Sequence, residues 1–179
     1  MKLSTRQIAV TAALLAVCII SQFFKNTSVF ITGPVINACI ILAGLSAGLS
    51  CGIILSVITP VTSFFISGSP VMSAIPAIIP CVMIGNILIV GCICLLSGKI
   101  KGNFGLPLSM LAGCIVKALF MGIVISLILI PMFLPEKMQP KMSVFQSTFS
   151  IVQLITGAVG CVYAHIIWIP LKKFIRNQN

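Results

Sequence analysis

Apolar residues dominate the chain in six long runs, which are separated by short stretches that contain polar residues, glycine or proline. A helix that crosses a membrane needs about 20 mostly apolar residues, because the hydrocarbon core is about 30 Å thick and each residue rises about 1.5 Å. The runs therefore predict an all-α integral membrane protein, with residues 1–179 forming a single domain, a bundle of six transmembrane helices. The predicted spans cover residues 6–24, 35–47, 50–67, 74–97, 105–130 and 144–170.

The composition excludes other classes of protein. Hydrophobic residues make up 59% of the chain, charged residues make up 7%, and the mean hydropathy is +1.25. A soluble domain has about 25% charged residues, so these values exclude a soluble globular protein and a disordered one. The first apolar run, from Ile8 to about Phe24, is too long for a signal peptide and has no clear small-residue cleavage site at its end. We interpret it as a retained first span.

Basic residues outnumber acidic ones by eleven to one, which gives a formal net charge of +10. On a soluble chain this excess would favour nucleic acid as a partner, but here the basic residues lie at the edges of apolar runs, so we expect no nucleic acid. Cytoplasmic loops of membrane proteins are enriched in Lys and Arg. We therefore predict that both termini are cytoplasmic. This orientation puts Lys2, Arg6, Lys99, Lys101, Lys172, Lys173 and Arg176 inside, and Lys25, Lys137 and Lys141 outside.

The sequence lacks the residues that several kinds of membrane protein need. It has no phosphate-binding loop of the G-x-x-x-x-G-K-[ST] type, one histidine, and a single acid, Glu136, in a predicted outer loop. Proton relays and cation filters use acidic side chains inside the membrane, so neither is expected, although a Na⁺ site made of carbonyls stays open. All eight cysteines lie inside apolar runs and are interpreted as packing residues. We expect no catalytic residue, no metal site and no cofactor.

One basic residue, Lys117, falls inside the fifth span, about 13 residues from either end. That position is about 20 Å from each end, too deep for the side chain to reach water fully, and an unpaired lysine there costs several kcal/mol. No acid is available to pair with it. Carbonyl groups, polar side chains or a ligand must therefore satisfy its ammonium group, and both a structural and a substrate-binding role remain open.

Other polar residues inside the spans are candidates for the same site. Asn86 and Gln153 each lie about ten residues inside the outer ends of spans 4 and 6, so they could converge with Lys117. Buried amides also serve as hydrogen-bond partners between helices. Phe30, in the first loop, belongs either to an aromatic belt or to a stacking lid over a flat ligand. Weaker candidates are Asn37, Thr59, Thr62 and Ser63.

The first span carries four alanines at helical spacing, Ala9, Ala12, Ala13 and Ala16. The pairs Ala9–Ala13 and Ala12–Ala16 each follow the small-xxx-small pattern, which lets another helix approach closely. The spacing does not distinguish packing within the bundle from docking of a partner subunit.

Four segments together resemble the substrate-binding S component of energy-coupling factor (ECF) vitamin transporters. They are the opening Ser4-Thr5-Arg6-Gln7-Ile8-Ala9 that runs into the alanine pattern, Phe30-Ile31-Thr32-Gly33-Pro34, Ile84-Gly85-Asn86, and Lys117-Ala118-Leu119. The size, the six spans and the cytoplasmic termini expected here agree with that family.

The resemblance implies a bacterial plasma-membrane protein that binds a vitamin or related micronutrient in an outward-opening pocket. It also implies docking through the alanines of span 1 onto a transmembrane coupling subunit that is driven by two cytoplasmic ATPases. The family's pockets point to Phe30, Asn86, Lys117 and Gln153, and riboflavin-type members use an Asn in span 4 and a Lys in span 5. The aromatic-rich pocket of thiamine-binding members is not apparent, so the substrate stays open.

Two other functions remain open on the sequence. One is a stand-alone facilitator or Na⁺-coupled carrier, and the other is a non-transport scaffold subunit of a membrane complex.

Overall fold

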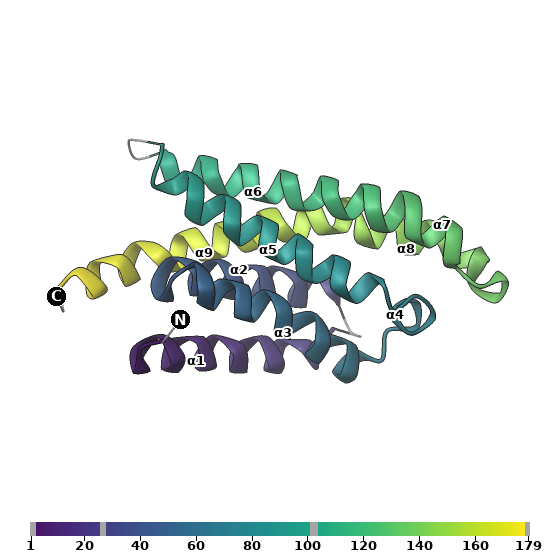
Figure 1. The fold of residues 1–179 in the computed structure, drawn as a ribbon, viewed down its shortest axis with the longest axis horizontal. Coiled ribbons are helices and arrows are strands. Elements are labelled where there is room, and N and C mark those ends of the chain that lie inside the picture. Colours follow the sequence, from purple (N-terminus) through teal and green to yellow (C-terminus); the bar gives the residue numbers. More distant parts are fainter. Residues whose placement is uncertain (1–2, 26–27, 101–103, 178–179) are drawn as a thin grey trace.

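The computed structural model describes residues 3–25, 28–100 and 104–177, with side chains as far as residue 173, and every element in these ranges is helical. Figure 1 shows the helices lying side by side along one long axis. The elements are α1 (Thr5–Gln22), α2 (Val29–Ala47), α3 (Leu49–Ser67), α4 (Pro70–Ala74), α5 (Ile78–Ser97), α6 (Gly105–Met121), the π-helix η1 (Gly122–Leu129), α7 (Ile130–Phe133), the 3₁₀-helix η2 (Glu136–Lys141), α8 (Met142–Phe149) and α9 (Ile151–Asn177).

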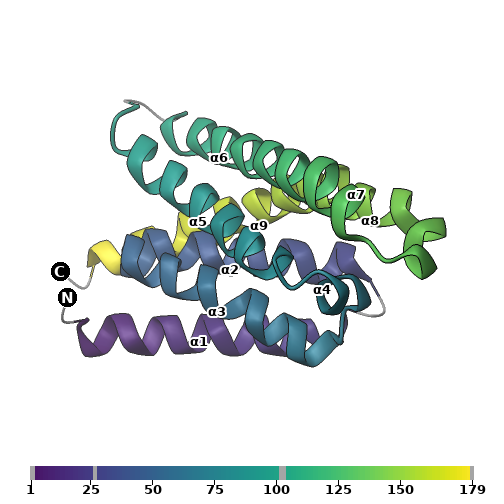
Figure 2. The same cartoon turned by 45° about the vertical axis from the view of Figure 1, so that its right-hand side comes forward.

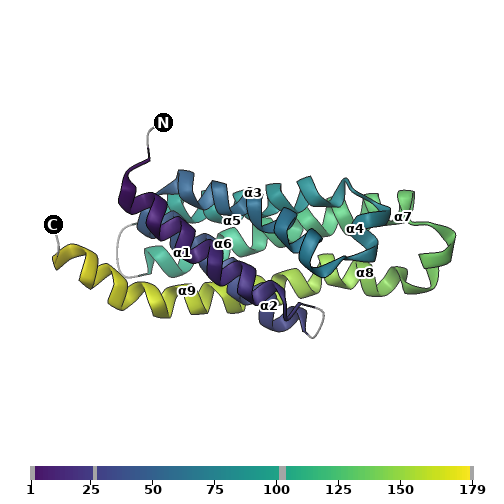
Figure 3. The same ribbon diagram turned by 90° about the horizontal axis from the view of Figure 1, so that it is seen from below.

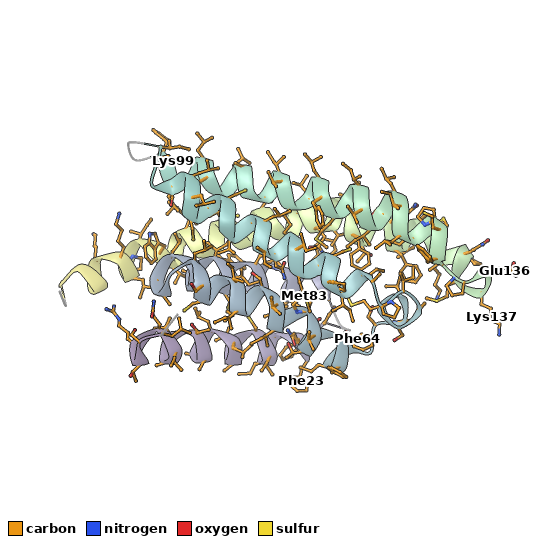
Figure 4. The ribbon with its side chains drawn as sticks, in the orientation of Figure 1. Phe23, Phe64, Met83, Lys99, Glu136 and Lys137 are labelled. Carbon is orange, nitrogen blue, oxygen red and sulfur yellow. The ribbon has the colours of Figure 1, made fainter. Side chains whose placement is uncertain are left out.

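Six helical segments are long and apolar enough to cross a membrane, which gives the described chain the architecture of a multi-pass membrane protein. The fifth and sixth candidate spans join neighbouring elements, Gly105–Phe133 and Glu136–Lys173. Both chain ends lie at one end of the bundle in all three ribbon views (Figures 1, 2 and 3). Lys99 lies at that same end, whereas Glu136 and Lys137 lie at the opposite end (Figure 4). The direction of the bundle across the membrane stays a prediction.

The first helix is fixed at the end of the bundle that carries the termini. Ser4 and Gln7 form a capping box, in which Ser4 N–H donates to Gln7 Oε1 at 2.9 Å and Gln7 N–H donates to Ser4 Oγ at 3.3 Å. Gln7 Nε2 also donates to the carbonyl oxygen of Ala47 at 2.7 Å. Gln7 therefore ties the start of α1 to the turn between α2 and α3, where Gly48 has a φ of 98° that favours glycine.

The central helix is α2, which packs against α1, α3, α5 and α9. Its sequence is apolar on all sides, as expected for a helix surrounded by other helices. Glycines bring its neighbours close. A Cβ atom added to Gly160 of α9 would lie 2.6 Å from Asn37 Cβ and 2.9 Å from the carbonyl oxygen of Pro34. Close approach through small residues is the usual way in which membrane helices pack, and here it fixes α9 against the middle of α2.

We expect Gly160→Ala to destabilise the protein by about 1–3 kcal/mol, because the new methyl group would meet the backbone of α2, which cannot move aside. Thermal unfolding can be followed with a thiol-reactive dye, since five cysteines are buried in the folded bundle. The matched control is Gly91→Ala on α5, where an added Cβ meets nothing within 4 Å. Equal midpoints for the two variants would contradict the close packing of α2 and α9.

Two helix starts differ from the sequence-based prediction because of proline. The second span begins at Val29 rather than at residue 35, and Pro34 lies inside α2. The position is close enough to the helix start for proline to remove few hydrogen bonds. The fourth span was predicted from residue 74, but α5 begins at Ile78 and α4 is separate. Ile75 is extended, with φ −129° and ψ 82°, as the residue before Pro76 prefers to be.

The last two spans are less regular than predicted. The fifth predicted span, 105–130, corresponds to α6, η1 and α7 in succession, so a π-helix replaces eight residues of α-helix. The sixth, 144–170, is divided at Ser150 into α8 and α9. Ser126 of η1 and Gln146 of α8 exchange two hydrogen bonds, Ser126 Oγ to the Gln146 carbonyl at 2.7 Å and Gln146 Nε2 to the Ser126 carbonyl at 2.9 Å. These bonds hold α8 beside the π-helix.

Candidate functional site

A cavity of about 280 Å³ lies between α2, α3, α5, α6, α8 and α9, and its lining includes Val71 and Met72 of α4. Its apolar lining includes Phe145 and Phe149, which are one turn apart on α8. Half of the lining residues are polar. The polar residues are Lys25, Thr32, Asn37, Thr59, Ser63, Ser67, Ser69, Asn86, Lys117, Thr148 and Gln153.

The floor of the cavity is a cluster of three residues from three helices, Asn37 of α2, Asn86 of α5 and Lys117 of α6. Lys117 Nζ donates to Asn37 Oδ1 at 2.5 Å and to Asn86 Oδ1 at 2.8 Å. All three side chains are buried, with exposed fractions of 2–3%. The structure therefore brings together Lys117 and Asn86, as the sequence predicted, and adds Asn37, which was only a weaker candidate. We call these three residues the floor cluster.

The floor cluster provides hydrogen-bond acceptors for Lys117, which lies inside a predicted span and has no acidic residue to pair with. A lysine ammonium group only donates hydrogen bonds, so both asparagines must turn their oxygens toward it. Gly85 of α5 allows the close approach of α6, because a Cβ added there would lie 3.0 Å from Met121 Sδ and in ordinary contact, at 3.6 Å, with Lys117 Cγ. Among the described residues Lys117 Nζ has these two acceptors, so one of its three donor positions is unused there.

The same orientation exposes hydrogen-bond donors to the cavity. The side-chain oxygens of Asn37 and Asn86 accept hydrogen bonds from Lys117, so their amide nitrogens point away from it. Within the described residues neither nitrogen has a hydrogen-bond partner. Both asparagines belong to the cavity lining, so their amide groups lie at its surface. The floor therefore offers N–H groups to a ligand and is suited to oxygen or ring-nitrogen acceptors.

A second lysine lies higher in the cavity. Lys25, in the turn after α1, is half-buried, and its Nζ donates to Ser63 Oγ of α3 at 2.6 Å. Burial lowers the pKa of Lys25 from its usual value, because desolvation disfavours the charged form. No carboxylate is among the described residues that line the cavity. The cavity is thus electropositive at two levels.

Two other predicted site residues have different positions. Gln153, the third residue of α9, lines the cavity, but within the described chain its side chain makes no hydrogen bond to the floor cluster. Phe30 is 57% exposed at the start of α2 and is not part of the lining, so its position does not support a contact with substrate. The aromatic side chains in the cavity are those of Phe145 and Phe149.

Sequence reasoning missed Lys25, Phe145 and Phe149. Lys25 had been counted only as a charge outside the membrane. The spacing of the two phenylalanines, four residues apart, places them on one face of a helix and could have indicated a shared surface.

The four alanines of α1 are all exposed, and they lie on a helix that packs mainly against α2 and α3. Ala9, Ala12, Ala13 and Ala16 thus form a small-residue face that the bundle itself does not cover. Of the two interpretations of the spacing, packing within the bundle does not hold in this structure.

Within the described residues, no three His, Cys, Asp or Glu side chains come together in a group that could hold a metal ion. Comparisons of the chain with known protein families, with curated proteins and with solved structures find no match. The fold and the cavity define a helical multi-pass membrane protein with a buried polar site.

Proposed function

We propose that this protein is the membrane-embedded substrate-binding subunit, or S component, of an ECF-type transporter in a bacterial plasma membrane. It would take up a vitamin or related micronutrient, with energy supplied by partner ATPases. The observation that carries the proposal is the floor cluster, a hydrogen-bonded lysine at the base of a cavity deep in the bundle. Ionisable residues inside membrane spans are costly and mark substrate paths more often than structural positions.

The other features of the chain support a subunit that binds substrate rather than one that supplies the energy for transport. The sequence has no phosphate-binding loop, and its one acid, Glu136, lies in η2, outside the cavity lining. A proton relay along the cavity would need acidic or histidine side chains, and the described lining holds none. Energy for uptake would then come from other subunits, through the exposed alanine face of α1.

We expect Ala13→Trp to prevent assembly with a coupling subunit and two ATPases. These partners are encoded in the same genome and are co-expressed with this chain. An indole ring on a small-residue face blocks the close approach of another helix, so recovery of the ATPases should fall about tenfold or more. The measurement is affinity purification through a tag on this chain. The matched control is Leu119→Trp, on an exposed position of α6, which should leave recovery unchanged.

The same purification separates the alternatives. Wild-type recovery of the ATPases by Ala13→Trp would contradict docking through α1. Substrate uptake by the purified chain alone in liposomes would favour a stand-alone facilitator or carrier. If the purified protein carries no bound small molecule and recovers no ATPase, a scaffold subunit is favoured.

A further inference from the structure

The mouth of the cavity holds a lysine whose environment is unusual for a residue near a membrane surface. A lysine at the end of a membrane helix normally extends toward water or lipid headgroups. Lys25 instead turns inward, and its Nζ lies 2.6 Å from Ser63 Oγ, one turn before the end of α3. The only acid of the chain, Glu136, lies in η2 and is not part of the cavity lining. The positive charge of Lys25 therefore points into the cavity without a counter-ion.

One hydroxyl group contacts this lysine, and others line the same cavity. Ser63 accepts the hydrogen bond from Lys25, so its own O–H is free to donate in another direction. Ser69, just before α4, and Thr148, on α8, line the same cavity. A cation together with O–H donors, enclosed on several sides, is a suitable environment for a carboxylate or phosphate oxygen.

The mouth and the floor are separate along the helix axis. Asn37 and Asn86 are each eight residues from the start of their helices, which begin at Val29 and Ile78. Eight residues of α-helix rise about 12 Å. Ser63 lies four residues before the end of α3, so the Lys25–Ser63 pair is only about 6 Å from the floor along the bundle axis. A ligand that fills the cavity therefore meets a lysine without a carboxylate partner at each end, Lys117 at the floor and Lys25 at the mouth.

We propose that Lys25 and Ser63 form an anion subsite that binds an acidic group, a carboxylate or a phosphate, of the substrate whose other end lies on the floor cluster. This inference rests on the proposal that the cavity is the substrate site, and it names the substrate class: an organic acid that also carries hydrogen-bond acceptors for the floor cluster.

The test uses acetate and inorganic phosphate as probes, because the substrate itself is not identified. Lysines of the full-length protein in a neutral detergent are labelled with ¹³C-methyl groups, and the Lys25 signal is assigned by its loss in Lys25→Arg. Each anion is titrated at constant ionic strength with chloride as the balancing salt. We expect the Lys25 signal to shift along a saturable curve, whereas the exposed Lys137 shows only a small linear change.

Two variants locate the anion. Ser63→Ala should weaken the response at Lys25, because it removes the neighbouring hydroxyl group. Lys99→Gln, which changes an exposed lysine outside the cavity lining, should leave that response in place. A response that is linear, that equals the response of Lys137, or that disappears in Lys99→Gln would overturn the anion subsite.

A lipid headgroup is the competing source of the same chemistry. A short-chain phosphatidylglycerol is therefore added to the detergent in a parallel titration. A shift of Lys25 with this lipid but not with acetate or phosphate would overturn the subsite for a soluble acid. The result is distinguishable from a failure of the proposed function, because the titration needs neither the ATPases nor the natural substrate.

Discussion

Replacing Lys117 by alanine is expected to remove most of the substrate affinity of the cavity. The lysine carries the floor's only charge, and it keeps one donor position after its bonds to Asn37 and Asn86. A hydrogen bond to a charged group contributes about 1.5–3 kcal/mol, so we expect an affinity loss of about 10- to 100-fold. The measurement is mass spectrometry of the small molecule that remains on the purified protein, calibrated per folded molecule.

The control for this loss is Lys137→Ala, which removes an exposed lysine of η2 outside the cavity. It should retain the small molecule as the wild type does. Full retention by Lys117→Ala would assign that lysine to structure alone and would contradict the floor as a binding surface.

The second large effect concerns stability. Asn86→Leu alone should destabilise the protein by about 1–3 kcal/mol, because it leaves a buried lysine with one acceptor in place of two. Replacing the whole floor cluster together, with Asn37→Leu, Asn86→Leu and Lys117→Met, should restore most of that loss. Exchanging all members of a buried polar network for apolar groups of similar shape is often neutral or stabilising.

The thiol-dye unfolding midpoints of the single and triple variants test this expectation, and ligand retention is measured beside them. A triple variant that is stable but binds nothing would show that the floor cluster is kept for recognition and not for folding. A triple variant that is less stable than Asn86→Leu would instead make the cluster a structural element.

Much of the fold could be predicted from the sequence, because the length and polarity of a run determine whether it can cross a membrane. The six runs correspond to the six candidate spans. The ends were less predictable. Pro34 sits inside a helix near its start, and Ser150 interrupts a run that is apolar on both sides. Neither outcome follows from composition, because neighbouring helices decide whether a break is tolerated.

The candidate site could be predicted only in part, for a related reason. The sequence gives the depth of a residue along a span. That depth was enough to predict that Lys117 and Asn86 lie at a similar level in the bundle. It does not give the direction around the helix axis. In a membrane both the lipid-facing and the buried sides are apolar, so the polarity pattern that orients a helix in a soluble protein is missing. This is why Asn37 was ranked low, whereas Phe30 was chosen as a residue of the first loop and Lys25 was counted as a charge outside the membrane.

The orientation of the two floor asparagines has a consequence for selectivity. Because Lys117 fixes both amide oxygens, neither side chain can flip to accept a hydrogen bond without leaving the lysine unsatisfied. A ligand that carries an amino group in place of an oxo group would present hydrogens to hydrogens at the floor. A site built to bond one pattern of substituents rejects the analogue that leaves its groups unpaired. The protein would thus distinguish two molecules of nearly identical shape by the exchange of a single substituent.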